Sequence, residues 1–159
     1  MPPITAVLHT HNDALRLGRA LETLCPCDEI LIIDHQSEDG TQSVAKEYGA
    51  KIVSAPKESA ETKFIPTVAN GWIFCLDPQE ALTEGLSASL FEWKSAPAPP
   101  PTSCFAVFQR EETPTGWVQH PLPQTRLVPA RWNSWKGRFP AANSPVGSLE
   151  GELLRFTYP

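Results

Sequence analysis

The sequence predicts an α/β fold with a mostly parallel, wound sheet and a strand-rich C-terminal part. Three observations support this fold class. Short apolar runs alternate with helical patterns up to residue 95, two of those runs end at an acidic residue, and several strand-like segments follow residue 102. Alternating strands and helices favour a parallel sheet with right-handed crossovers. A chain of 159 residues fits one domain with a real hydrophobic core.

The first strand and the first helix come from residues 4–24. Residues 4–8 are apolar and run into a polar loop, as at the end of a strand. Asn12 or Asp13 can cap the helix that follows, because a short polar side chain accepts the free amide hydrogens of a first turn. The apolar residues of this helix recur every three or four positions: Ala14, Leu17, Leu21 and Leu24.

Three more strands are predicted in this half, at residues 29–34, 51–54 and 71–76. A helix over residues 41–48 joins the first two of them, and Gly49 suits the left-handed position that ends a helix. Residues 55–70 could hold one short helix. Beyond residue 77, apolar residues at helical spacing predict an amphipathic helix: Leu82, Leu86, Leu90 and Trp93.

The chain changes character after a proline-rich segment at residues 96–101. This segment has too much proline for a helix or a central strand, so we predict an extended spacer. Short strands divided by Pro, Gly and Asn follow it, at residues 104–108, 116–118, 125–128 and 149–156. The predicted organisation is a single domain over residues 1–159, with an α/β half at 1–95, the spacer, and a strand-rich half at 102–159.

The composition argues against several classes of protein. A formal net charge of −5 provides no basic surface for a phosphate backbone, so nucleic acid is not an expected partner. The N-terminus lacks the basic lead and apolar length of a signal peptide, and no apolar run approaches the roughly 20 residues that span a bilayer. Four cysteines are too few and too unevenly spaced to predict disulfides. We expect a cytoplasmic protein with no transmembrane segment, and peripheral membrane contact stays open.

Two of the predicted strands deliver a carboxylate to the same edge of the sheet. Asp34 ends the second strand, and Asp77 directly follows the fourth. Because open α/β sheets bind ligands outside the carboxyl ends of their strands, these residues predict a ligand site. A structural role is the alternative. Asp commonly caps turns, and Asp77, Gln79 and Glu80 could begin the next helix, where carboxylates favour the positive end of the dipole.

Four segments in order resemble motifs of the family 2 glycosyltransferases. Residues 4–12 (ITAVLHTHN) are similar to I-S-V-V-I-x-T-x-N, and residues 29–41 (EILIIDHQSEDGT) to E-I-I-V-V-D-x-x-S-x-D-G-T. Residues 49–53 and 71–80 match in the same order, the latter against G-D-W-I-L-x-L-D-A-D-E. The closest subgroup is related to lipopolysaccharide core glucosyltransferases. Its late motifs R-L-F-R, G-x-V-H-E and G-x-L-L-H-Y correspond to residues 126–129, 137–141 and 151–156.

This resemblance implies a compact, divergent GT-A-like domain. It also implies a transferase with a UDP- or GDP-type nucleotide-sugar donor and a glycan or lipid-linked acceptor. Asp77, with Glu80 beside it, would hold Mg²⁺ or Mn²⁺, hard cations that prefer oxygen ligands. The strand-rich half would face the acceptor, with His120 on that side. Four residues at matching positions would line the nucleoside pocket: Thr10, Asn12, Asp34 and Asp39.

Two departures from the family pattern bear on the metal site and on the general base. Gln79 stands where the family has a second metal-binding Asp, and an amide brings no charge to hold a cation. Pro140 and Ala141 stand where the subgroup has His-Glu, so the general base and the catalytic residues are unknown. Two hypotheses follow. The chain is either a glycosyltransferase with degenerate metal and base motifs, or a catalytically inactive relative that binds a nucleotide or a protein partner.

Overall fold

The computed structural model describes residues 2–56, 68, 71–142 and 147–159. Its helices are α1 (Ala14–Glu22), α2 (Thr41–Glu47) and α3 (Glu84–Ser95). Its strands are β1 (Ile4–Thr10), β2 (Glu29–Asp34), β3 (Lys51–Ser54), β4 (Trp72–Cys75), β5 (Glu80–Leu82), β6 (Phe105–Thr113), β7 (Gly116–Gln119), β8 (Gln124–Pro129), β9 (Trp135–Lys136), β10 (Phe139–Pro140) and β11 (Gly147–Arg155). None of these helices has both the length and the apolar character that a membrane crossing requires.

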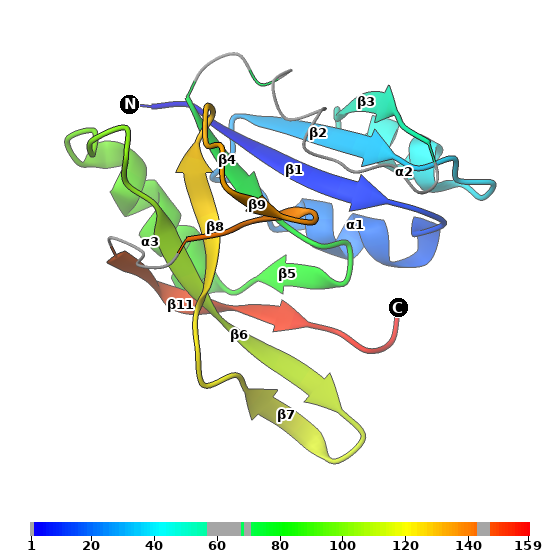
Figure 1. Cartoon of the computed structure of the whole chain (residues 1–159). Helices are drawn as coiled ribbons and strands as arrows, with labels where there is room; N and C mark the ends of the chain where they lie inside the picture. The colour runs from blue at the N-terminus through cyan, green and yellow to red at the C-terminus, as the bar shows by residue number, and fades with distance from the viewer. Residues whose placement is uncertain (1, 57–67, 69–70, 143–146) are drawn as a thin grey trace.

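Nine of the described strands form one continuous sheet in the order β3-β2-β1-β4-β8-β6-β11-β5, with β7 paired to β6 (Figure 1). The strands β3, β2, β1 and β4 are mutually parallel. Strand β8 is antiparallel to both β4 and β6, whereas β11 is parallel to β6 and antiparallel to β5. The predicted α/β fold is therefore confirmed, with the predicted parallel order in β3-β2-β1-β4. The strand-rich half extends the sheet that the first half begins.

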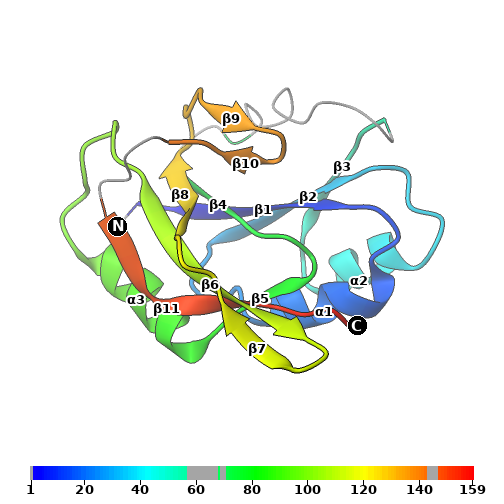
Figure 2. The same cartoon turned by 60° about the horizontal axis from the view of Figure 1, so that its bottom comes forward.

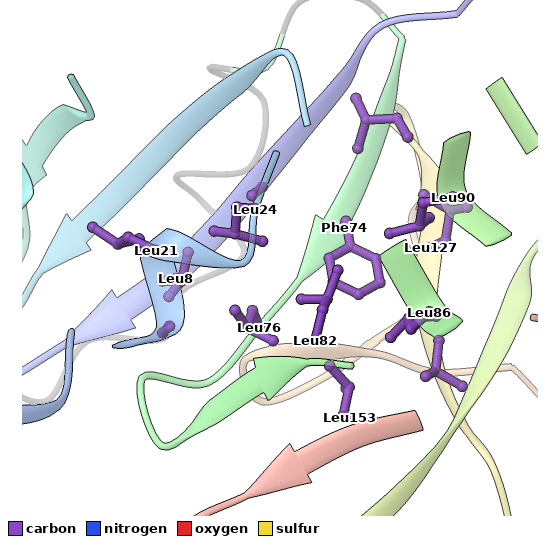
Figure 3. Close-up of a cluster of buried hydrophobic side chains, with 14 of the residues drawn as sticks. Leu8, Leu21, Leu24, Phe74, Leu76, Leu82, Leu86, Leu90, Leu127 and Leu153 are labelled. Carbon is purple, nitrogen blue, oxygen red and sulfur yellow. The ribbon is translucent and has the colours of Figure 1, made fainter. Parts of the chain in front are cut away.

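Apolar side chains cover both faces of this sheet. The helices lie on one face, and the hairpin of β9 and β10 lies on the other (Figure 2). Every residue of β1 is buried, as expected for a strand that is covered on both faces. The core on the helix side includes Leu8, Leu21, Phe74, Leu86, Leu127 and Leu153 (Figure 3). The core on the hairpin side includes Val7, Ile33, Ile73 and Val128, with Trp132, Trp135 and Phe139 packed against it.

The segment after Asp77 differs from the sequence-based expectation. The alternative that residues 77–80 begin a helix is wrong, because Glu80 starts β5 and the helix α3 begins only at Glu84. Thr83 caps α3, since its side-chain oxygen accepts a hydrogen bond from the Leu86 amide at 3.3 Å. Periodicity missed β5, because a three-residue strand offers too few positions to show alternation.

The expected cap of α1 also needs correction. The Asp13 side chain does not cap α1, because it accepts from the His11 amide, and the first-turn amide of Ala14 donates to Asp39 instead. The hairpin of β9 and β10 was not expected from the sequence. The short helix suggested for residues 55–70 falls almost entirely outside the described residues.

Gly151 provides a test of how tightly α3 packs against β11. A Cβ at this position would lie 2.2 Å from the Leu86 amide nitrogen and 2.6 Å from the Gly85 carbonyl carbon, and the φ angle is +90°. We expect Gly151→Ala to lower the free energy of unfolding by about 2–6 kcal/mol, from backbone strain and overpacking together. Urea titration followed by circular dichroism measures this loss.

The matched control is Gly49→Ala. Gly49 also has a positive φ, of +74°, but no atom of the described residues lies within 4 Å of the position that a Cβ would take there. We expect this change to cost only about 1–2 kcal/mol, from the left-handed backbone alone. Equal losses for the two variants would contradict close packing between α3 and β11.

Candidate functional site

The carboxyl ends of β1, β2 and β4 bring several predicted site residues to one edge of the sheet. Thr10 and Asp34 end β1 and β2 and are direct neighbours in the parallel register of these strands. Strand β4 pairs with β1 on its other side, and Asp77 follows β4 by two residues. Asn12 and Asp39 belong to the loops that follow β1 and β2. The sequence-predicted positions therefore share one edge, although their environments differ.

Asp34 is fully buried, and both of its carboxylate oxygens accept hydrogen bonds. The hydroxyls of Thr10 and Ser37 donate to Oδ1 at 2.7 and 2.6 Å, while the Ser37 amide and the Gln42 side chain donate to Oδ2. Burial raises the pKa of Asp34, but these hydrogen bonds outweigh it and hold the pKa below its ordinary value. Asp34 thus stabilises the turn after β2 through its hydrogen bonds to Ser37. No part of its side chain is exposed to a ligand.

Asn12 and Asp39 are exposed, unlike the buried Thr10 and Asp34 at the ends of β1 and β2. The Asn12 side-chain oxygen accepts from the Glu38 amide at 2.8 Å, which ties the loop after β1 to the loop after β2. Asp39 accepts from the amides of Ala14 and Thr41, at the starts of α1 and α2. Both side chains therefore hold the two loops together while remaining open to solvent.

Arg155, at the end of β11, reaches the loop that contains Asp77. Its Nη1 lies 3.8 Å from Asp77 Oδ1, and its Nη2 donates a hydrogen bond to the Gln79 side-chain oxygen. On its other side, Arg155 Nε lies 3.8 Å from Glu111, whose carboxylate is 3.2 Å from His120 Nε2. Arg155 therefore connects the Asp77 loop to the region of His120. Sequence reasoning missed this residue, although it stands where the resembling motif has His.

Glu80 points into the sheet, where it contacts the backbone of Asp77 and not the Asp77 carboxylate. Both of its oxygens pair with the buried Arg126 guanidinium, at 2.6 and 2.8 Å. Its Oε1 also accepts from the Asp77 amide, and its Oε2 accepts from the Gln109 side chain. Glu80 and Arg126 are 0% and 2% exposed, so this is a fully buried ion pair. These four hydrogen bonds engage both oxygens of the Glu80 carboxylate within the sheet.

The side chains beside Asp77 do not fit a divalent cation in this arrangement. A hard cation requires several oxygen ligands, and carboxylates usually hold it. Here the Gln79 oxygen accepts from Arg155, Glu80 is buried in its ion pair, and the Asp77 carboxylate faces the Arg155 guanidinium. Within the described part of the chain, no group of three or more His, Cys, Asp and Glu side chains could hold a metal ion.

His9 and His35 form a buried pair beneath the same edge. His35 Nδ1 lies 2.8 Å from the Pro56 carbonyl oxygen, which can only accept, so Nδ1 carries the proton. His35 Nε2 is then an acceptor for His9 Nδ1, at 2.9 Å. This tautomer leaves His9 Nε2 unprotonated and buried, and no hydrogen-bond partner reaches it in the described structure.

The cavity next to His9 is very small. A cavity of about 10 Å³ is lined by His9, Asp77, Arg138 and Phe139, among others, and holds at most one water molecule. A much larger cavity, of about 490 Å³, lies at the amino end of β4, where Gly71, Trp132 and Asn133 line it. None of the predicted site residues borders the larger cavity.

The buried ion pair of Glu80 and Arg126 predicts a large effect of Glu80→Gln. This change keeps the shape of the side chain but leaves the Arg126 charge buried without a counter-charge. We expect a loss of about 3–5 kcal/mol in the free energy of unfolding. The matched control is Lys51→Ala, which breaks the exposed ion pair with Glu29 and should cost less than about 1 kcal/mol. Similar losses in urea titrations of both variants would contradict this role for Glu80.

The buried His9 predicts a pH dependence of stability. Burial first, and then the neighbouring Arg138 and His35, lower the pKa of His9 from 6.5 to about 3. Between these values the unfolded chain binds a proton that the folded chain does not. Stability should therefore fall as the pH drops below 6.5, with a slope of up to about 1.4 kcal/mol per pH unit.

The variant His9→Gln should reduce this slope between pH 6.5 and about 5, measured by urea unfolding at each pH. His120→Gln is the control, because its imidazole is partly exposed beside Glu111. An unchanged slope in His9→Gln would show that the His9 imidazole does not stay neutral in the fold.

No protein-family model matches the chain. The chain is 32% identical over 94 residues to an uncharacterized glycosyltransferase of Rickettsia felis, a match that covers 54% of this chain and 32% of that protein. It is 33% identical over 87 residues to an uncharacterized glycosyltransferase of Rickettsia bellii, covering 52% of this chain and 30% of the relative. The matches therefore span about one third of the length of these relatives.

Solved structures of glycosyltransferases share the fold. S. aureus TarS superimposes with a TM-score of 0.66 at 10% identity, over 99% of this chain and 37% of that chain. Glucosyl-3-phosphoglycerate synthase from Mycobacterium tuberculosis, in complex with Mn²⁺, UDP and glucosyl-3-phosphoglycerate, gives 0.52 at 18% identity, over 69% and 44%. S. aureus TarS 1–349 in complex with UDP gives 0.54 at 13% identity, over 72% and 37%. The chain is thus related in sequence to uncharacterized glycosyltransferases and has the GT-A-type fold.

Proposed function

We propose that this chain is a glycosyltransferase domain that transfers a sugar from a nucleotide-sugar donor to a glycan or lipid-linked acceptor. One observation supports the proposal most directly. The loops after β1, β2 and β4 lie at one edge of a GT-A-type sheet, and they contain the polar residues that the motifs predict. Ligands of open α/β sheets bind at such an edge.

The donor in this proposal is a UDP- or GDP-type sugar, and its nucleoside lies over the loops after β1 and β2. Asn12 and Asp39 are the residues exposed there, so they contact the nucleoside in this proposal. Thr10 and Asp34 support these loops without contacting the nucleoside. Their hydrogen bond, of 2.7 Å, joins the ends of β1 and β2. Uridine is favoured, because two of the structures that share the fold contain UDP.

The leaving diphosphate lies near Asp77 in this proposal, and His120 lies toward the acceptor. Mn²⁺ accompanies UDP in the glucosyl-3-phosphoglycerate synthase structure. In this chain the carboxylate of Asp77 is the one charged oxygen donor offered to Mg²⁺ or Mn²⁺ by residues 77–80, since Glu80 is buried in its ion pair.

A catalytically inactive, nucleotide-binding relative is the second candidate function. Pro140 pairs with Trp135 in the hairpin of β9 and β10, and Ala141 follows it. Neither side chain can accept a proton, and the absence of a general base costs roughly 10²–10⁴ in rate. Nucleotide binding without turnover is what this candidate predicts.

Calorimetric titration with UDP, GDP and their sugars tests the proposed site. We expect Asn12→Asp to weaken nucleotide binding by about tenfold or more, because a carboxylate replaces an amide donor and repels the phosphates. Asp still tolerates the positive φ of 54° at this position and can accept from the Glu38 amide. Asn133→Asp is the control, because Asn133 lies at the amino end of β4.

The outcomes separate the candidate functions. Release of UDP or GDP from a nucleotide-sugar supports the transferase. Binding without release supports the inactive relative. The proposed site is rejected if the native chain binds none of these nucleotides, either with or without Mn²⁺, because an interaction module would then be the better description.

A further inference from the structure

We propose that the Arg155 guanidinium takes the place of a divalent cation at Asp77, so that this site binds a nucleoside diphosphate without metal. The ligand class is the diphosphate of the nucleotide. This inference rests on the proposed function, because it requires a nucleotide at this edge of the sheet.

The backbone fixes Arg155 beside the Asp77 loop. Arg155 ends β11, where it is opposite Glu80 of β5 in the antiparallel register and opposite Glu111 of β6 in the parallel register. The next amide, of Phe156, donates to the Gln79 carbonyl oxygen at 2.8 Å. The end of β11 is thus hydrogen-bonded to the same loop that its side chain contacts.

The guanidinium lies beside the two side-chain oxygens that this loop would offer to a cation. Its Nη1 is 3.8 Å from Asp77 Oδ1, and its Nη2 donates to the Gln79 side-chain oxygen. A divalent cation between these two oxygens would meet the positive charge of Arg155 at short range, and like charges repel most strongly where water is partly excluded. Asp77 is 27% exposed and Arg155 is 32% exposed, so this loop is only partly open to water.

Arg155 also keeps the capacity to bind phosphate. A guanidinium has five N–H donors in a planar fork that matches the oxygens of a phosphate group. The hydrogen bond to Gln79 uses one of them, and the contacts with Asp77 and Glu111, at 3.8 Å, are ion pairs longer than hydrogen bonds. The exposed part of the fork can therefore donate to a diphosphate that approaches from solvent.

Two departures from the resembling motifs meet at this point. Gln79 replaces an acidic residue, and Arg155 replaces a histidine, at positions 76 residues apart in the chain. In the fold they form a direct hydrogen bond. An amide can accept from the guanidinium without neutralising it, whereas a second carboxylate at position 79 would reduce the positive charge available to the diphosphate. The two changes are chemically complementary.

Isothermal titration of the full chain with UDP and GDP, in EDTA and in Mn²⁺, tests this inference. We expect the dissociation constants in the two conditions to agree within about twofold. Arg155→Ala should weaken UDP binding about 10- to 100-fold, as expected for the loss of a charge-assisted hydrogen bond. Binding of UMP should change much less, because UMP lacks the second phosphate.

Three further variants sharpen the result. Arg155→Lys keeps the charge without the fork and should recover part of the affinity for UDP. Arg110→Ala is the matched control, because Arg110 is an exposed arginine of the adjacent strand β6 that pairs with Glu152 at 3.0 Å. The double variant Gln79→Asp with Arg155→His should bind UDP weakly in EDTA and at least about tenfold more tightly in Mn²⁺. Thermal unfolding checks that each variant is folded.

The failure of this inference differs from the failure of the proposed function. If the native chain binds UDP or GDP only in Mn²⁺, or if folded Arg155→Ala binds UDP as tightly as the native chain, the role of Arg155 is overturned and the proposed function stands. If the native chain binds neither nucleotide in either condition, both are overturned.

Discussion

The buried ion pair between Glu80 and Arg126 organises the centre of the molecule. Through its hydrogen bonds it joins the start of β5, the β8 strand, the Cys75 carbonyl at the end of β4 and the Asp77 amide. The Phe139 ring packs on the same guanidinium, with its centroid 4.2 Å away. Removing two charges from water costs several kcal/mol for each ion, so the pair is tolerable only because its geometry is bidentate and both Arg126 Nη atoms donate further hydrogen bonds. Among the described residues, Arg126 Nε has no hydrogen-bond partner. The Asp77 loop and the β9–β10 hairpin both contact this ion pair.

This arrangement divides the acidic residues of the site edge into two groups. Asp34 and Glu80 are buried and saturated with hydrogen bonds, so they support the loops from below. Asp39 is exposed and Asp77 is partly exposed, so these two can meet a ligand. The distinction matters for function, because a carboxylate with no exposed oxygen can bind a nucleotide only after its internal hydrogen bonds are broken.

The environment of Asp77 also bears on the choice between an active enzyme and an inactive relative. A degenerate metal motif would argue for lost activity if nothing replaced the cation. Arg155 supplies a positive charge at that position and bridges toward Glu111 and His120. The loss of a metal ligand is therefore weaker evidence against catalysis than the sequence suggests. The Pro140–Ala141 pair remains the stronger argument, because no described feature replaces a base there.

The fold class, the strands β2 and β3, and the shared edge of Asp34 and Asp77 can all be predicted from the sequence. These features depend on local periodicity and on the carboxyl-end rule for parallel strands, both of which can be read within short windows. Which carboxylates are buried depends on contacts between residues far apart in the chain. Glu80 finds its counter-charge in Arg126, 46 residues away, and Asp77 finds Arg155 farther along the chain. The strand β5 could not be predicted for the same reason, since its pairing with β11 stabilises it. The β9–β10 hairpin pairs over only a few residues, but it packs on a core built from distant strands, which no local pattern shows.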